Sequence, residues 1–245
     1  MQKKDCVSIE FCRLCNSKHL IKVFDLGRTP LANSYSKVKI SKKLKKYPLR
    51  LNYCNSCGHL QLAHSIKPSK MFSNYLYKSN TSKKNFIHFK KYAYEIKKKI
   101  KNTNTKILDI ASNDGTFLNF FEKKRFFRLG IDPAKNLKKL SIKKGITQID
   151  DFFTKKISEN IKKKYGKFDF ILANHVLNHA DNDLSFLLGC KNLLETNSIL
   201  IIEVPYWAYQ VKNNLFDQIY HEHRNYFTIT YFNYLQEKLN FKIIN

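Results

Sequence analysis

The sequence predicts an α/β protein in which a small metal-binding module precedes a doubly wound, parallel sheet. Two Cys-x-x-Cys pairs, Cys12–Cys15 and Cys54–Cys57, stand near the N-terminus. From Lys106 onward, short apolar strands alternate with helical segments, a pattern typical of a parallel sheet with helices on both faces. The chain has 245 residues, 43% of them hydrophobic, which is enough for one large domain or two smaller ones.

The two cysteine pairs predict a metal site. Each pair can hold one metal ion from a tight turn, and two pairs complete a tetrahedral sulfur shell. In a reducing compartment such motifs favour zinc over disulfides, with iron or a redox role as the alternative. The expected ligands of one structural zinc ion are Cys12, Cys15, Cys54 and Cys57. Cys6 is the one competing thiol, and we do not expect Cys190, His59 or His64 to bind the metal.

Three regions are expected along the chain: a zinc-binding module over residues 1–70, a helical linker over 71–100 and the sheet domain over 101–245. Apolar runs predict strands over residues 106–110, 127–131, 168–173, 198–203 and 241–245. Helices are expected over residues 116–124, 136–144 and 184–194.

The first candidate site lies where the predicted strands end, because ligands of such sheets bind at the carboxyl ends of the strands. The turn at residues 111–115 follows the first strand, and its Gly115 would let the backbone approach a ligand closely. Asp132 ends the second strand, where it can accept hydrogen bonds from ribose hydroxyls. The turn lacks the G-x-G-x-x-G phosphate cradle, so a ligand with a ribose but no phosphate, such as S-adenosylmethionine, fits better. An ordinary strand–turn–helix junction is the alternative.

The second candidate site is Tyr220-His221-Glu222-His223, which joins a phenol, a carboxylate and two imidazoles in four residues. In an extended or turn segment, we expect residues two apart to point the same way. We therefore expect His221 and His223 on one side, and Tyr220 and Glu222 on the other. Such a cluster can take up a proton near neutral pH. A polar surface loop with incidental histidines is the alternative.

An ordered set of motifs from about residue 12 to about residue 227 resembles the sugar C-methyltransferase family of deoxysugar pathways. The motifs are C-x-x-C at 12–15, L-G at 26–27, P-L-A-N at 30–33, Y-P-L at 47–49, C-x-x-C-G at 54–58, Y-x-Y-x-S at 75–79, S-N-D-G at 112–115, G-I-D-P at 130–133, A-N-H-V at 173–176 with His179, E-V-P-Y at 203–206, F-D at 216–217 and Y-H-E-H at 220–223. The resemblance implies a zinc module and a Rossmann-like class I methyltransferase domain. It also implies that a methyl group passes from S-adenosylmethionine to a ring carbon of a nucleotide-linked 4-keto-deoxysugar, through an enolate.

By motif match, the resemblance implies roles for single residues. His223 would be the base, Tyr220 and Glu222 would orient sugar and base, and a further imidazole, that of His179, would line the sugar pocket. Tyr77, in the linker, would face the sulfonium, which an aromatic ring attracts. The other expected cofactor contacts are Ser79, Ala111, Asn113, Asp114, Asp132 and Asn174.

Two departures from the family stand out. Ala111 replaces a glycine that is usual in the cofactor turn. The resemblance also implies further strands and a C-terminal domain beyond Asn245. We therefore expect the chain to be short of the family's full length, and to need that domain or a second polypeptide to help hold the nucleotide-sugar.

The charge of the chain is extreme, with 45 Lys and Arg against 19 Asp and Glu and a formal net charge of +26. A basic surface attracts polyanions, but the lysines are dispersed, so compositional drift is the preferred explanation and no nucleic-acid partner is expected. Without an apolar leader or a long apolar run, we expect a soluble, cytoplasmic protein with no membrane partner. Two alternatives stay open: a methyltransferase acting on RNA or on a small-molecule O or N nucleophile, and a non-catalytic scaffold.

Overall fold

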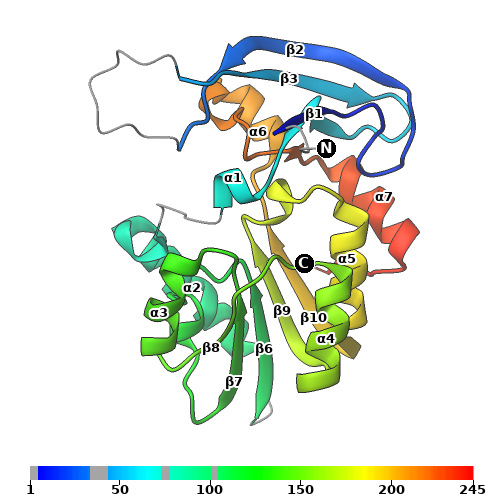
Figure 1. The fold of residues 1–245 in the computed structure, drawn as a ribbon. Coiled ribbons are helices and arrows are strands. Elements are labelled where there is room, and N and C mark those ends of the chain that lie inside the picture. The colour runs from blue at the N-terminus through cyan, green and yellow to red at the C-terminus, as the bar shows by residue number, and fades with distance from the viewer. Residues whose placement is uncertain (1–4, 34–43, 73–77, 101–103, 245) are drawn as a thin grey trace. The chain divides into compact units, whose positions relative to one another are not determined.

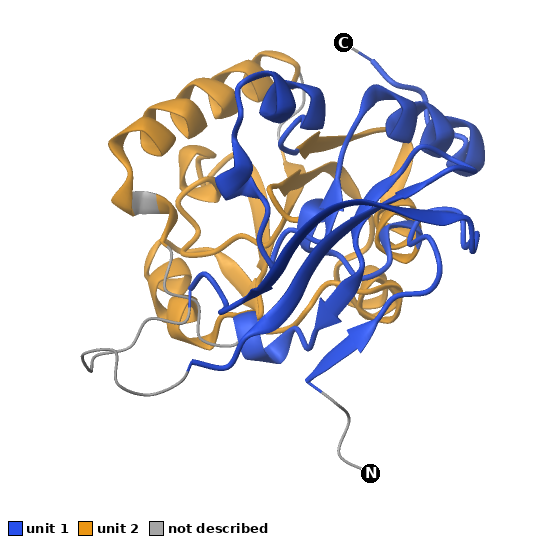
Figure 2. Cartoon of the chain, turned by 90° about the horizontal axis from the view of Figure 1, so that it is seen from above, with its two compact units in different colours: residues 1–71, 177–184, 204–245 blue, residues 72–176, 185–203 orange. Residues whose placement is uncertain are grey.

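The computed structural model describes residues 5–33, 44–72, 78–100 and 104–244. The chain divides into two compact units, which Figure 2 colours separately. Unit 1 comprises residues 1–71, 177–184 and 204–245, and unit 2 comprises residues 72–176 and 185–203. Segments far apart in the sequence thus share a unit. The compact units therefore differ from the linear division expected above, and the domain boundaries at 70 and 100 stay a prediction.

Unit 2 is built on a five-stranded parallel sheet in the order β10-β9-β6-β7-β8. Its strands are β6 (Thr105–Ile110), β7 (Phe126–Ile131), β8 (Thr147–Ile149), β9 (Phe168–Asn174) and β10 (Leu194–Glu203). The strand order reverses beside β6, which has β7 on one side and β9 on the other. Such a reversal opens a crevice at the carboxyl ends of the strands, where ligands of this sheet type bind.

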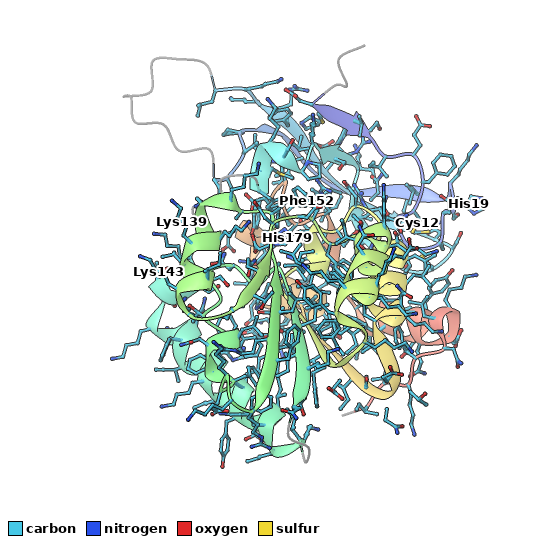
Figure 3. All side chains as sticks on the ribbon, turned by 60° about the horizontal axis from the view of Figure 1, so that its bottom comes forward. Cys12, His19, Lys139, Lys143, Phe152 and His179 are labelled. Atoms are coloured by element: carbon cyan, nitrogen blue, oxygen red, sulfur yellow. The ribbon has the colours of Figure 1, made fainter. Side chains whose placement is uncertain are left out.

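Helices cover both faces of this sheet. They are α2 (Lys83–Lys98), α3 (Lys135–Lys143), α4 (Lys155–Tyr165) and α5 (Asp183–Asn192), with short 3-10 turns η1 (Ser79–Thr81) and η2 (Leu118–Phe120). In Figure 1, α2 and α3 lie on one side of the sheet, and α4 and α5 lie on the other. The helices bear the dispersed lysines, such as the exposed Lys139 and Lys143 on α3 (Figure 3).

Most predicted elements of this unit are confirmed: four strands, over 106–110, 127–131, 168–173 and 198–203, and two helices, over 136–144 and 184–194. The helix expected over 116–124 is wrong, because only η2 turns there. Phe117, Leu118 and Phe121 are all buried in one core cluster with Phe126. Since Phe126 already begins β7, the chain must direct these apolar side chains inward within a few residues, and a regular helix does not form.

Unit 1 contains an antiparallel sheet in the order β11-β4-β3-β2. Its strands are β2 (Leu20–Thr29), β3 (Tyr47–Cys54), β4 (Leu60–Leu62) and β11 (Asn225–Tyr226), and a separate pair joins β1 (Cys6–Ser8) to β5 (His64–Ile66). Its helical segments are α1 (Ser69–Phe72), η3 (Leu177–His179), α6 (Trp207–Lys212), η4 (Phe216–Gln218) and α7 (Ile229–Leu239). Apolar side chains of β3, β4 and β11 form its core together with Ile219.

The strand expected at the end of the chain is wrong for residues 241–244, which form none. Helix α7 ends at Asn240, whose φ of 52° is left-handed. The amide of Phe241 then donates to the carbonyl of Gln236, and the amide of Ile243 donates to the Gln236 side chain. These donors therefore terminate the helix instead of pairing with a neighbouring strand. In the described residues, every helix is too short or too polar to cross a bilayer.

Candidate functional site

Four thiols of unit 1 gather in one place. Cys12 and Cys15 share a turn, Cys54 closes β3, and Cys57 lies in the turn before β4. All four Sγ atoms lie within 4.8 Å of one another, with Cys12 and Cys57 3.5 Å apart and Cys15 and Cys54 3.6 Å apart. Tetrahedral zinc, with Zn–S bonds of about 2.3 Å, places its sulfurs about 3.8 Å apart. The cluster therefore fits the predicted zinc ion.

One thiol of the cluster is made more acidic by its neighbour, whereas the pKa values of Cys57 and Cys15 are raised. The pKa of Cys12 is lowered to about 5, first because the Cys57 thiol hydrogen-bonds to it. Cys6, Cys190 and His64 are not part of the cluster. His59 is not part of it either, and its Nε2 hydrogen-bonds to Asn225 Oδ1 at 3.1 Å. Cys12 is well separated from His179 in Figure 3, so the metal cluster is distinct from the imidazoles described below.

In unit 2, Asp132 joins the ends of β6 and β7. Its Oδ2 accepts a hydrogen bond from the amide of Asn113 at 2.9 Å, and its Oδ1 accepts one from the amide of Ala134 at 2.8 Å. The side chain is buried, and this burial is the main reason why the pKa of Asp132 is raised. The carboxylate thus fixes the turn at the ligand-binding edge of the sheet, and each oxygen keeps a further lone pair for a hydroxyl.

The segment before α2 is attached to the same turn. The amide of Ser79 donates to Oδ1 of Asn113 at 3.0 Å, and the amide of Asp114 donates to the same oxygen at 2.9 Å. Ser79 and Asn113, predicted from separate motifs, are therefore brought together. Tyr77, the expected sulfonium contact, lies outside the described residues.

Asn174 ends β9, the neighbour of β6 on the side away from β7. Its side-chain Oδ1 and Nδ2 are buried, and neither has a hydrogen-bond partner among the described residues. Buried amides in native proteins are nearly always hydrogen-bonded, so an unpaired amide at this edge indicates that a polar ligand completes it. Asn113, Asp132 and Asn174 thus fit a cofactor that carries a ribose and charged polar groups.

Two residues of the turn make contacts with the rest of unit 2, and the expected cofactor contact of Asp114 stays a prediction. A Cβ at Gly115 would lie 2.5 Å from Cδ1 of Ile146 and 2.7 Å from Oγ of Ser141. Gly115 therefore packs against the protein itself, and the expectation that it makes room for a ligand is wrong. Asp114 is fully buried, and its carboxylate lies 3.2 Å from Nζ of Lys144. This ion pair supports the turn from inside.

Residues 220–223 form a turn in unit 1, closed by a hydrogen bond of 3.0 Å from the His223 amide to the Tyr220 carbonyl. The Tyr220 hydroxyl consequently lies 2.8 Å from Nε2 of His223. The expected pairing of His221 with His223 is wrong, because the turn brings residues three apart together, where an extended strand would align residues two apart. The ring of His221 packs edge-on against Tyr47 instead, with centroids 6.0 Å apart.

Backbone carbonyls fix the tautomers of two imidazoles. Nδ1 of His223 lies 3.0 Å from the Gln218 carbonyl, and Nδ1 of His179 lies 2.7 Å from the Glu222 carbonyl. A carbonyl only accepts, so each Nδ1 carries the proton, and the neutral rings have their basic lone pair on Nε2. The two rings lie 5.2 Å apart between centroids. The structure thus brings His179 and His223 together with Tyr220.

Glu222 acts through two groups. Its backbone carbonyl orients His179, as above, and its buried Oε1 accepts a hydrogen bond of 2.6 Å from Nδ2 of Asn33. Asn33 belongs to the P-L-A-N motif, which the sequence associates with the family but with no role. Its contact with Glu222 gives that motif a structural function.

Sequence reasoning missed the residues that hold the segment 177–184 in place. Asp181 accepts hydrogen bonds from Ser65 Oγ at 2.7 Å and from Arg13 Nη1 at 3.2 Å, and it pairs with the guanidinium of Arg224. The amide of Arg224 donates to the carbonyl of Asn178 at 2.7 Å. These contacts fix the backbone on either side of His179 and beside His223. Their partners are distant in sequence, so no local pattern signals them.

The comparisons with known proteins agree with this geometry. Residues 82–245 match the family described as "Methyltransferase domain", which is more than half of the chain. The chain belongs to this methyltransferase-domain family. Residues 12–72 of the methyltransferase chain match a second family, described as "Putative zinc binding domain", and this range contains all four clustered cysteines.

Individual relatives extend this result. The chain is 29% identical to the C-methyltransferase NovU of Streptomyces niveus over 90% of its own length. It spans only 53% of that relative, about half of its length. Solved structures with the same fold include the plantazolicin methyltransferase BpumL in complex with an analog and SAH, at 18% identity and a TM-score of 0.51 over 66% of this chain and 65% of that one. The plantazolicin methyltransferase BamL matches at 19% identity and a TM-score of 0.50 over 65% of this chain and 63% of that one.

Proposed function

We propose that this methyltransferase uses S-adenosylmethionine to methylate a ring carbon of a nucleotide-linked 4-keto-deoxysugar. The observation that carries the proposal is the pairing of Tyr220 with Nε2 of His223, whose other nitrogen is held by a backbone carbonyl. Methylation at carbon needs a base, because a C–H bond must lose its proton before the carbon becomes a nucleophile. Methylation of a hydroxyl requires much less elaborate acid–base machinery.

His223 is the proposed base. A carbon next to a ketone can lose its proton, and the electron pair of that C–H bond then spreads onto the ketone oxygen as an enolate. Nε2 of His223 has the lone pair that takes the proton once the Tyr220 hydroxyl turns from this nitrogen to the ketone oxygen, and the Gln218 carbonyl stabilises the imidazolium that results. Glu222, whose carboxylate is held by Asn33, is proposed to help orient the sugar and the base.

Tyr220 is the proposed donor to the enolate oxygen. Burial, and then the carboxylates of Glu222 and Asp217, raise the pKa of Tyr220. The phenol therefore keeps its proton and can donate a hydrogen bond where negative charge develops. His179, whose ring is oriented by the Glu222 carbonyl, has a second Nε2 near His223 and is proposed to line the sugar pocket.

The cofactor is proposed to bind in unit 2 through Ser79, Asn113, Asp132 and Asn174. When bound, S-adenosylmethionine supplies a methyl group on a sulfonium, an electrophile that the enolate carbon attacks as the methyl–sulfur bond breaks. Asp132 would accept from ribose hydroxyls, and the unpaired amide of Asn174 would complete its hydrogen bonds on the ligand. The zinc cluster, distant from the imidazole cluster in unit 1, is proposed to be structural.

The test is a direct assay of the reaction. The chain is incubated with S-adenosylmethionine and a nucleotide-linked 4-keto-6-deoxysugar, and the product is analysed by mass spectrometry and NMR. We expect a product with one added methyl group on the carbon beside the ketone. The matched control is the same nucleotide-sugar with a hydroxyl in place of the ketone, which should not react. Methylation of the control at oxygen would contradict the proposal, and so would binding of both ligands without any loss of the acidic proton.

A further inference from the structure

Unit 1 contains a cavity whose lining includes none of the four zinc-site cysteines and none of residues 220–223. It has a volume of about 360 Å³ and lies between strands β2, β3 and β4 and the α6–η4 segment (Figure 1). Its lining is mostly apolar, and it includes the aromatic rings of Phe24, Trp207 and Phe216. Small-molecule sites commonly have this size and composition, with a few polar groups that fix the orientation of the ligand.

Gln210 supplies such a polar group. It lines the cavity, is only 4% exposed, and its Oε1 is buried without a hydrogen-bond donor among the described residues. Its backbone is fixed, since its amide donates to Tyr206 and its carbonyl accepts from Leu215. A buried amide oxygen without a partner is costly. A ligand that brings an N–H donor into the cavity would remove this cost.

The aromatic rings supply a stacking surface. Phe24 and Phe216 are nearly parallel, with an angle of 13° between planes and centroids 6.1 Å apart. Both are exposed, by 38% and 58% respectively. Phe24 is on strand β2, which forms the edge of its sheet. Exposed aromatic faces at the mouth of a cavity favour a flat ligand, because planar rings stack on them over a large area.

We propose that this cavity binds the uracil or thymine base of a nucleotide. The imide edge of these pyrimidines has an N–H between two carbonyls. Gln210 can accept that N–H through Oε1 and can donate through Nε2 to an adjacent carbonyl, while the ring stacks on Phe24 or Phe216. The inference rests on the proposed function, because a nucleotide-linked sugar is the substrate that brings a base to this protein.

A single ring suits the cavity better than a protein partner does. A docked helix or strand would cover the aromatic rings, but it would also have to place a polar donor into an otherwise apolar cavity. N3-methyluracil has a methyl group in place of the imide N–H and no other N–H donor on that edge, so the site is expected to discriminate against it. The comparison of these two bases is therefore the most specific part of the test.

Trp207 is the only tryptophan of the chain and lines the cavity, so its fluorescence reports on occupancy. UDP, TDP and N3-methyl-UDP are titrated against the full chain. UDP and TDP should quench or shift the emission, and N3-methyl-UDP should bind at least about fivefold more weakly, since it leaves Gln210 Oε1 unpaired. Phe216→Leu should weaken UDP binding about five- to 150-fold, the range for one lost stacking contact. Tyr94→Leu, at an exposed aromatic of unit 2, is the matched control and should change nothing.

Gln210→Leu should bind UDP and N3-methyl-UDP equally. Equal affinity of the parent for both, or unchanged binding in Phe216→Leu, would overturn the proposal, as would nucleotide-independent dimerisation that Phe216→Leu abolishes. Because fluorescence needs no turnover, the base site and the reaction are judged separately. Tight UDP binding without methyl transfer contradicts only the proposed function. Methyl transfer with an unchanged KM in both cavity variants contradicts only the base site.

Discussion

The hydroxyl of Tyr220 lies 2.8 Å from Nε2 of His223, while the Gln218 carbonyl occupies Nδ1 of the same ring. One turn therefore sets the tautomer, the orientation and the hydrogen-bond partner of a single imidazole. The pKa of Tyr220 is raised by burial, which keeps the phenol as the donor of this pair. A neutral His223 is then restricted to one basic nitrogen, and that nitrogen faces a group able to stabilise negative charge.

The zinc cluster should be lost when one thiol is removed. We expect Cys15→Ser to carry no zinc and to unfold at a lower temperature, because structural zinc contributes folding free energy. Elemental analysis of protein purified without chelator measures the metal, and thermal unfolding with and without EDTA measures its effect. Cys6→Ser, outside the cluster, is the control. Full zinc content in Cys15→Ser, or equal loss in Cys6→Ser, would rule out the four-thiolate site.

Replacement of Ala111 by glycine should stabilise the folded protein. Its φ of 62° is left-handed, which costs an L-residue roughly 1–2 kcal/mol, partly offset because glycine loses more backbone entropy on folding. Ala111→Gly should therefore raise the free energy of unfolding by up to about 1 kcal/mol. Ala93→Gly, inside helix α2, should lower it by about 1 kcal/mol. Urea unfolding measures both, and a destabilised Ala111→Gly would show that the methyl group is needed in the turn.

The sequence predicted the parts of the site that depend on local patterns. Buried strands ending at Ile110 and Ile131 place Asn113 and Asp132 at one edge of the sheet, because parallel strands share their carboxyl edge. The partner of His223 was not predictable in the same way. Residues 220–223 form a turn because the His223 amide donates a hydrogen bond to the Tyr220 carbonyl. The order of polar and apolar residues along the chain does not predict this hydrogen bond.

Contacts between distant segments were also beyond prediction. The role of Asp181 depends on Arg13, Ser65 and Arg224, which reach it from three other segments of unit 1. A single sequence gives no sign of such convergence, since each residue is an ordinary polar side chain in its own neighbourhood. Gly115 is a different case. The sequence indicated that glycine is needed at this position, but the reason is its close packing against Ile146 and Ser141.

Removal of the Asp132 carboxylate should weaken cofactor binding. We expect Asp132→Ala to bind S-adenosylmethionine more weakly by roughly 1–3 kcal/mol, the range for a lost hydrogen bond to a charged group. Asp132 also accepts the amides of Asn113 and Ala134, so part of the loss comes from a looser turn. Asp132→Asn keeps one acceptor oxygen and should lose less. Calorimetry measures the dissociation constants, and an unchanged value in Asp132→Ala would exclude this residue from the site.

The stability of the protein should fall as pH rises through the titration of Asp183. Burial raises the pKa of Asp183 from 3.8 to about 7, against the opposing hydrogen bond from Tyr231. The folded state therefore binds more protons than the unfolded state between these values, so the contribution of this group to stability is lost as pH rises from about 3.8 to about 7. Asp183→Asn should flatten this dependence in urea unfolding across that range. An equally steep slope in the variant would assign the effect to other groups.

His223→Ala should abolish removal of the acidic sugar proton while leaving cofactor binding nearly intact. Nε2 of His223 is the basic nitrogen of a fixed ring, and loss of a positioned base typically costs about 100- to 10,000-fold in rate. Cofactor contacts are proposed in unit 2, whereas His223 belongs to unit 1, so calorimetry with S-adenosylmethionine should give the parent value. The rate is read from exchange of the sugar proton in deuterated water, which reports the base separately from methyl transfer.

The controls for His223 separate the base from its neighbours. Tyr220→Phe removes the phenol but leaves both imidazoles, so exchange should slow less than in His223→Ala. His221→Ala alters an imidazole that packs against Tyr47 and should have little effect on exchange beyond any loss of stability. If His223→Ala exchanges the proton as fast as the parent, His223 is not the base. Nε2 of His179, which the Glu222 carbonyl holds in the same tautomer, would then be the group to test, because it is the other basic nitrogen that this turn orients.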